Sequence, residues 1–111
     1  MEEIRIGEYV RTRGIIGKLA RIEYDKVDVF LKWYVLDRGN YEISYVNKPY
    51  IEKHSFNLID LIEVGDTVNK KIVVEKNENG DLMLSDGYWY YEHDIKTIIT
   101  KEQMKSIEYE V

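Results

Sequence analysis

The chain has 111 residues, a formal net charge of −5, 44% hydrophobic and 33% charged residues, and no cysteine. Length and composition suit one compact globular domain without disulfides. No apolar run approaches the ~20 residues that cross a bilayer, and no signal-peptide pattern opens the sequence, so we expect a cytoplasmic protein without a membrane segment.

Two short segments share the pattern apolar-x-apolar-Gly-acid-x-Val. They are Ile4–Val10 and, 58 positions later, Ile62–Val68. Glycine adopts a backbone conformation that other residues resist, and acid-x-Val begins an alternating strand, as is common in SH3-like barrels. The sequence therefore predicts a mainly β fold with one or two short helices. Residues 1–54 and 55–111 are expected to form two small SH3-like units packed as one domain.

The first half predicts two strands after this motif. The run from Lys18 to Leu36 alternates apolar and polar residues and predicts one long strand, covered on both faces for part of its length. Residues 37–40, Asp-Arg-Gly-Asn, predict a turn into a returning strand over residues 41–45. Pro49 is expected at or beyond the end of that strand.

The second half predicts a short helical turn, a meander and a second helix. Ser55 is the expected cap of the turn over residues 55–61. Asn79-Gly80 and Asp86-Gly87 are type I′ hairpin dipeptides. They delimit expected strands near 71–77, 81–85 and 88–92, followed by a strand over 95–99. Thr100 and Gln103 form a capping box, which predicts a helix through about residue 106 and a closing strand over 107–111.

The aromatic run Tyr88-Trp-Tyr-Tyr91 supports two interpretations. If Tyr88 and Tyr90 face solvent, they can anchor a protein partner. Alternatively, Trp89 and Tyr91 fill the core while the two tyrosines make cross-strand pairs. Trp33 and Trp89 both lie on the apolar face of an alternating strand, so both are expected to be largely buried.

The acidic second half favours a protein partner over a nucleic acid. Residues 55–111 contain six Lys/Arg and twelve Asp/Glu, whereas residues 1–54 contain ten and nine. Nucleic-acid affinity depends largely on cations that neutralise phosphates, which makes direct binding of DNA or RNA an unfavoured expectation. The expected partner-binding residues are Tyr88 and Tyr90, with Glu78, Asp81, Glu92 and Asp94 steering association.

An alternative anion site lies in the first half, where all five arginines occur before residue 39. Arg11 and Arg13 share a face of the expected strand, and Lys18 and Arg21 lie just across the turn at Gly14–Gly17. Such a group could bind a phosphate or an acidic protein surface. It could equally be a solvated face paired with acids of the second half.

Motifs for catalysis and metal binding are weak. Glu92-His93-Asp94 has no third or fourth ligand at a suitable spacing, and the other histidine, His54, is unrelated to it. The serines lack a Gly-x-Ser-x-Gly elbow, and the glycines are dispersed rather than gathered into a phosphate-binding loop. We therefore expect a protein that is not an enzyme and has no cofactor and no metal.

Two blocks of the chain resemble short uncharacterised proteins of phages and prophages of Gram-positive bacteria. The blocks are Lys53–Asn69, KHSFNLIDLIEVGDTVN, and Ile95–Gln103, IKTIITKEQ. The resemblance implies a mobile-element protein acting in a bacterial cytoplasm. Small acidic accessory proteins of this kind often bind and block a host protein, including CRISPR nucleases and other defence complexes.

The leading hypothesis is accordingly a non-enzymatic phage or prophage accessory protein that binds a host protein, such as an anti-CRISPR acting on a nuclease. A small nucleic-acid or nucleotide-binding barrel using the Arg11 and Arg13 face is one alternative. A component of virion assembly is another alternative. The sequence does not decide between a monomer and a homodimer.

Overall fold

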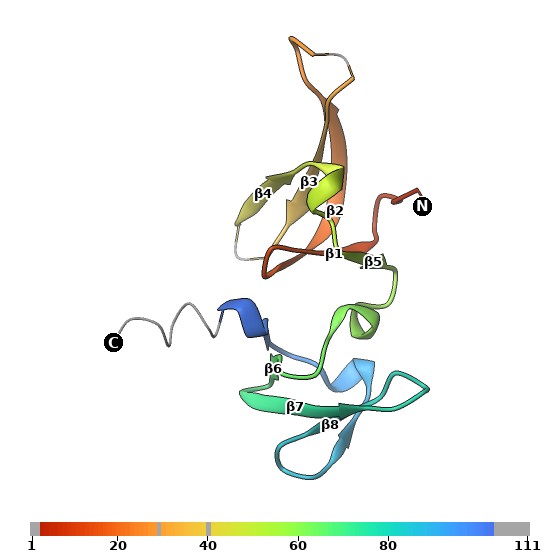
Figure 1. The fold of residues 1–111 in the computed structure, drawn as a ribbon, viewed down its shortest axis with the longest axis vertical. Helices are drawn as coiled ribbons and strands as arrows, with labels where there is room; N and C mark the ends of the chain where they lie inside the picture. The colour runs from red at the N-terminus through yellow and green to blue at the C-terminus, as the bar shows by residue number, and fades with distance from the viewer. Residues whose placement is uncertain (1–2, 29, 40, 104–111) are drawn as a thin grey trace, which may run out of the picture. The chain divides into compact units, whose positions relative to one another are not determined.

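A computed structural model describes residues 3–28, 30–39 and 41–103. The chain divides into two compact units, which we call unit 1, residues 1–56, and unit 2, residues 57–111. Each unit contains one five-stranded antiparallel sheet (Figure 1). The two units are described separately.

Unit 1 has the strand order β4-β3-β2-β1-β5. A 3-10 turn, η1 (Lys48–Tyr50), comes before the last strand and contains Pro49. The strands are β1 (Tyr9–Thr12), β2 (Ile15–Tyr24), β3 (Lys32–Asp37), β4 (Ile43–Val46) and β5 (Lys53–Ser55).

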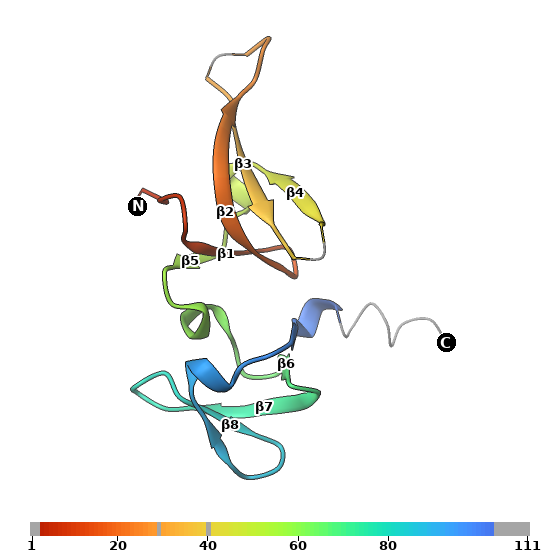
Figure 2. The same ribbon diagram turned by 180° about the vertical axis from the view of Figure 1, so that it is seen from behind.

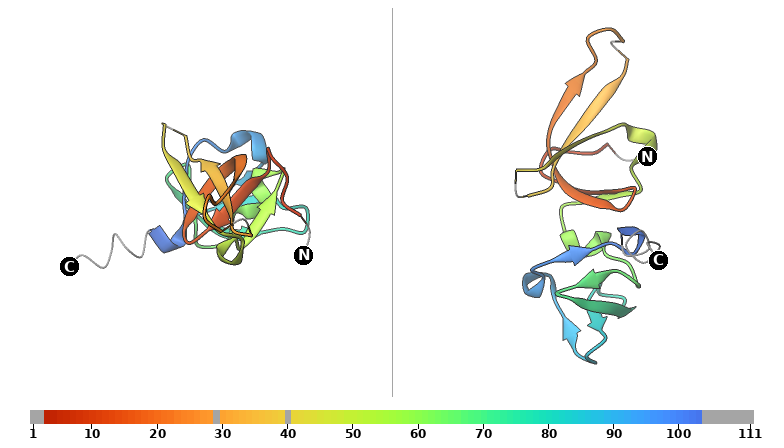
Figure 3. Two further views of the ribbon diagram at one scale, coloured as in Figure 1. Left: turned by 90° about the horizontal axis from the view of Figure 1, so that it is seen from above. Right: turned by 90° about the vertical axis from the view of Figure 1, so that its left-hand side faces the viewer.

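Unit 2 repeats this order as β10-β6-β7-β8-β9, again with a 3-10 turn, η3 (Glu92–Asp94), before the last strand. In the right panel of Figure 3 the paired strands β7 and β8 lie side by side. Counted within each unit, the order 5-1-2-3-4 is that of SH3-like barrels, so the predicted mainly β fold with two SH3-like units is confirmed. The elements are η2 (Leu58–Leu61), β6 (Thr67–Val68), β7 (Lys71–Lys76), β8 (Leu82–Leu84), β9 (Trp89–Tyr90) and β10 (Ile98–Ile99).

The repeated glycine has the same backbone role in both units. Gly7 and Gly65 have φ values of 99° and 100°, in a region that favours glycine. The N–H of Gly7 donates to the carbonyl of Leu19 at 2.9 Å, and the N–H of Gly65 donates to the carbonyl of Val73 at 2.9 Å. The shared sequence pattern therefore corresponds to one turn geometry that attaches the N-terminal segment of each unit to its longest strand.

Each unit has its own hydrophobic core. Most core residues lie on strands, where every second side chain faces the core, and Ile4, Ile59 and Ile62 come from segments outside the strands. The core of unit 1 contains Ile4, Val10, Leu19, Tyr34, Leu36 and Val46. The core of unit 2 contains Ile59, Ile62, Val68, Val73, Leu82 and Leu84.

The prediction of one long strand from Lys18 to Leu36 is wrong, because the chain reverses after Tyr24. The Asp25 carboxylate accepts hydrogen bonds from the N–H groups of Val27 and Asp28, which is the Asx-type bonding that starts a turn. Val27 and Phe30 are 96% and 92% exposed, so they mark a loop rather than a core strand. The resulting β2–β3 hairpin extends beyond the rest of unit 1 (Figures 1 and 2).

The type I′ assignment of the two glycine turns is also wrong. Type I′ needs a positive φ at both central residues, whereas only the glycines, Gly80 and Gly87, have one here. Each glycine is the fourth residue of a turn that its own N–H closes: Gly80 donates to the carbonyl of Asn77, and Gly87 donates to the carbonyl of Leu84. Two-residue turns with both φ values positive occur instead at 13–14 and 69–70.

The helix prediction holds at its start. The Thr100 N–H donates to Gln103 Oε1 and the Gln103 N–H donates to Thr100 Oγ1, which confirms the capping box, and a helical turn covers 101–103. The expected helix end near 106 and closing strand over 107–111 lie outside the described residues. Ser55 is not a cap, because it belongs to β5 and η2 begins after Asn57. In the described part of the chain, no helix has the length and apolarity needed to span a membrane.

Candidate protein-binding surfaces

Three of the four aromatic side chains at 88–91 are exposed. Tyr88, Trp89 and Tyr91 have exposed fractions of 70%, 38% and 50%. Tyr90 is half-buried and packs against the core of unit 2, because it pairs with the buried Leu82. The predicted burial of Trp89 is therefore wrong: the register places Trp89 opposite Met83, on the other side of the sheet.

Trp33 also lies outside a core cluster. It is half-buried on β3, and its indole N–H donates to Asp25 Oδ2 at 3.4 Å. Its strand neighbour Tyr34 faces the core instead. Tyr34, Val35 and Leu36 are all buried, so β3 is covered on both faces over these residues, as expected for part of the run, whereas Trp33 lies nearer the start of the strand and is only half-buried.

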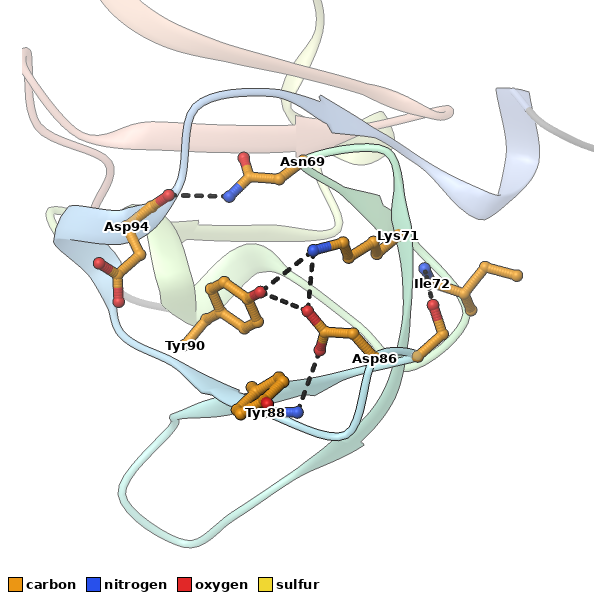
Figure 4. Close-up of polar contacts among 8 residues, drawn as sticks. Asn69, Lys71, Ile72, Asp86, Tyr88, Tyr90 and Asp94 are labelled. Carbon is orange, nitrogen blue, oxygen red and sulfur yellow. Dashed lines mark hydrogen bonds and ion pairs between the residues drawn. The ribbon is translucent and has the colours of Figure 1, made fainter.

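A polar network ties the turn after β8 to β7 (Figure 4). Lys71 Nζ lies 2.8 Å from Asp86 Oδ2 and donates to the Tyr90 hydroxyl at 3.3 Å. The Tyr90 hydroxyl donates to the same Asp86 oxygen, while Asp86 Oδ1 accepts the N–H of Tyr88 at 3.0 Å. These contacts hold β9, and with it the neighbouring exposed rings, in one position.

The same network sets the charge state of Asp86. Hydrogen bonds from Lys71 and then from the Tyr90 hydroxyl lower the pKa of Asp86 to about 2, against a smaller rise from burial. The bond to Asp86 likewise raises the pKa of Lys71. Tyr90, one of the two predicted tyrosine anchors, therefore has a structural role, while Tyr88 is directed to solvent.

Of the four predicted steering acids, two are exposed and two form structural hydrogen bonds. Glu78 and Glu92 are exposed. Asp81 instead closes the turn after β7, since its N–H donates to Asn77 Oδ1 at 2.9 Å and its carboxylate accepts from the Asn77 amide. Asp94 accepts the Tyr91 N–H at 2.9 Å through Oδ2.

The Glu92-His93-Asp94 segment forms the turn η3 rather than a strand end. His93 Nε2 lies 3.4 Å from Asp94 Oδ1, and the His93 ring stacks on Tyr91 at a centroid distance of 6.0 Å. Over residues 3–28, 30–39 and 41–103, no three His, Asp or Glu side chains come together as metal ligands.

The predicted arginine face does not form as expected. Arg11 is buried, because β1 lies between β2 and β5 in the sheet. Arg13 is exposed in the β1–β2 turn and places its guanidinium 3.7 Å from the ring centroid of Tyr50. Lys18 lies over the Tyr9 ring, and Arg21 forms an ion pair with Glu23 at 2.8 Å. The four cations are thus engaged at separate places.

Unit 1 contains a cleft that the sequence did not predict. It has a volume of about 400 Å³ and lies among the β1–β2 turn, β3, β4 and η1. Tyr45 and Tyr50 both line it, but Arg13 is distant from them in sequence and reaches the Tyr50 ring only through the fold. Its lining residues are Thr12, Arg13, Ile15, Trp33, Ser44, Tyr45, Val46, Asn47 and Tyr50.

Comparison with protein-family models, with curated proteins and with solved structures found no match for this chain. The functional interpretation therefore depends on the surfaces described above.

Proposed function

We propose that the protein is a non-enzymatic binding module that engages a host protein through unit 2. The binding surface consists of Tyr88, Trp89 and Tyr91 with the exposed acids Glu78 and Glu92, and we call it the aromatic surface. The observation that carries the proposal is the exposure of three of the four aromatic rings at residues 88–91. Large aromatic side chains supply most of the energy of protein interfaces, because they bury much area at a small cost in side-chain entropy.

Rigidity supports this proposal. The turn that precedes Trp89 is tied to β7 through Asp86 and Lys71, and η3 after Tyr91 is closed by the Asp94 carboxylate. Backbone that is already ordered loses less entropy on binding, which leaves more of the contact energy as affinity.

Charge supports a basic partner. Residues 57–111 contain six lysines and twelve acids, and both acids of the aromatic surface are exposed. Such a field accelerates encounter with a basic protein such as a nucleic-acid-binding enzyme. The resemblance to phage proteins makes an antagonist of a bacterial defence complex, such as an anti-CRISPR acting in the host cytoplasm, the specific form of this proposal.

The test begins with capture of partners from a lysate of a Gram-positive bacterium on immobilised full-length protein, with nuclease treatment. A captured protein is then purified and its binding kinetics are measured. We expect a stoichiometric complex that the double variant Tyr88→Ala, Trp89→Ala weakens by roughly 10-fold or more. Tyr24→Ala, which removes an exposed tyrosine of unit 1, is the matched control and should leave affinity within about twofold.

Charge reversal separates steering from contact. Glu78→Lys with Glu92→Lys should slow association and reduce its dependence on salt, with dissociation nearly unchanged. Glu52→Lys, an exposed acid of unit 1, is the control. The proposal would be contradicted if neither the aromatic variant nor the acid variant changed the binding kinetics, or if nuclease treatment abolished binding.

A further inference from the structure

The Arg13–Tyr50 pair in unit 1 is arranged to receive an anion. Arg13 is exposed, and the Tyr50 ring covers one face of its guanidinium at 3.7 Å. In the described part of the chain, no carboxylate forms an ion pair with Arg13. Stacking leaves the in-plane N–H donors of a guanidinium available, and their fork matches a carboxylate.

This pair lies at the rim of an apolar cleft. Trp33, Tyr45 and Tyr50 supply aromatic walls, and Ile15 and Val46 supply aliphatic surface. Arg13 is the only charged residue of the lining, so the cleft offers apolar contacts beside a single positive charge. Its volume of about 400 Å³ is in the range of sites that hold one or two side chains of a ligand.

The aromatic walls are held by contacts outside the cleft interior. Trp33 donates its indole N–H to Asp25, and the Tyr45 hydroxyl accepts from Arg21 Nη2 at 3.4 Å. The Thr12 hydroxyl donates to the Tyr50 carbonyl, which ties η1 to β1. The site is therefore largely formed before a ligand arrives, which reduces the entropy that binding must overcome.

We propose that this cleft binds an extended segment of a partner protein in which an apolar side chain stands next to an Asp or Glu. The apolar side chain lies between Trp33 and Tyr50, and its neighbouring carboxylate receives the Arg13 fork. This acid-binding cleft is a second surface, distinct from the aromatic surface of unit 2, and it does not depend on the function proposed there. Its charge preference is opposite, since it selects an acidic ligand.

Nucleic acid is the other anionic candidate, and the cation count disfavours it. Phosphate binding gains strength from several cations in a row, and its salt dependence grows with the number of phosphates neutralised. Here Arg11 is buried and Arg21 is paired with Glu23, so the cleft presents one cation. One arginine suffices for a carboxylate but not for a phosphate backbone.

The test uses a library of random peptides of about twelve residues displayed on phage. Phage that bind the immobilised wild-type protein are selected, and phage that also bind the Arg13→Gln variant are removed. Enriched sequences should contain Asp or Glu next to an apolar residue. Basic enriched sequences, or no enrichment over the Arg13→Gln variant, would overturn the proposal.

A synthetic peptide of the most enriched sequence is then titrated into the isotope-labelled full chain and followed by NMR. Chemical shifts of the Trp33 indole N–H and of residues 12–15 and 44–50 should change, and Arg13→Gln or Tyr50→Ala should weaken binding by roughly 10-fold. Lys18→Ala, at another cation–π pair of unit 1, and Trp89→Ala in unit 2 are controls that should bind normally.

An oligo-dT of about twelve nucleotides is titrated in parallel. If oligo-dT changes the same NMR signals and Arg13→Gln abolishes those changes, the ligand of the cleft is a nucleic acid rather than a peptide. Peptide binding that Trp89→Ala removes would place the ligand on the aromatic surface instead and overturn the assignment to the cleft.

Discussion

Glu8 and Asp66 perform the same task in the two units. Each is buried, and each carboxylate accepts a backbone N–H from three residues before it, Glu8 from Arg5 at 2.5 Å and Asp66 from Glu63 at 2.7 Å. The acid in the repeated Gly-acid motif is therefore an internal partner for the backbone of its turn. Buried backbone donors need such a partner, because an unsatisfied one costs about 1–3 kcal/mol.

The first prediction concerns the contribution of Asp66 to stability. Asp66 Oδ1 accepts the Lys101 N–H at 2.9 Å, so Asp66→Ala leaves two backbone donors without this acceptor. We expect a loss of about 2 kcal/mol or more in the free energy of unfolding, with Asp66→Asn in between. Urea denaturation measures it, and Glu75→Ala on the exposed side of β7 is the control. Equal effects of the two alanine variants would argue against the role of Asp66.

The second prediction concerns pH and Glu8. Burial raises the pKa of Glu8, but hydrogen bonds from the Arg5 N–H and from His54, whose Nδ1 lies 3.0 Å away, together lower the pKa below its usual 4.5. A carboxyl with a lowered pKa stabilises the folded state above pH 4.5, and this contribution is lost as the pH falls through the folded-state pKa. Urea midpoints of unit 1 should therefore fall on acidification below pH 4.5, and less so in Glu8→Gln. An unchanged slope in that variant would exclude Glu8 as the cause.

The lowered pKa of Asp86 predicts a separate acid transition in unit 2. Its pKa is lowered from 3.8 to about 2 by Lys71 and the Tyr90 hydroxyl, so its contribution to stability is present above pH 3.8 and is lost towards pH 2. NMR signals of the turn at 84–88 should change in this lower range. Asp86→Asn should abolish that change, whereas Glu8→Gln should leave it. A titration of the turn near pH 4 would contradict the network in Figure 4.

Tryptophan fluorescence tests the exposure of the aromatic surface. Trp89 is 38% exposed and Trp33 is half-buried. In Trp33→Phe, emission from Trp89 should lie at longer wavelength and acrylamide should quench it more strongly than emission from Trp33 in Trp89→Phe. The reverse order would mean that the β8–β9 register differs from the pairing of Met83 with Trp89.

Local chemistry explains which features could be predicted. Gly7 and Gly65 were identified because a positive φ is intrinsic to glycine, and the Thr100–Gln103 capping box because its partners are three residues apart. The side-chain roles of Tyr90 and Arg13 were not predicted, because Lys71 reaches Tyr90 through the pairing of strands and Tyr50 reaches Arg13 through η1. The division of the predicted anchors into exposed and structural residues is a consequence of register.

The amino-acid sequence by itself determined the β class, the repeat of the Gly-acid turn and the excess of acids in the second half, because these follow from residue type and short-range geometry. The tertiary structure decided which face of each strand is buried. A single reversal at Asp25 placed Trp33 beside a cleft, and a two-residue strand placed Trp89 at the surface. A strand alternates with period two, so where it turns and which residue it pairs with select the inward set, and both depend on contacts distant in sequence.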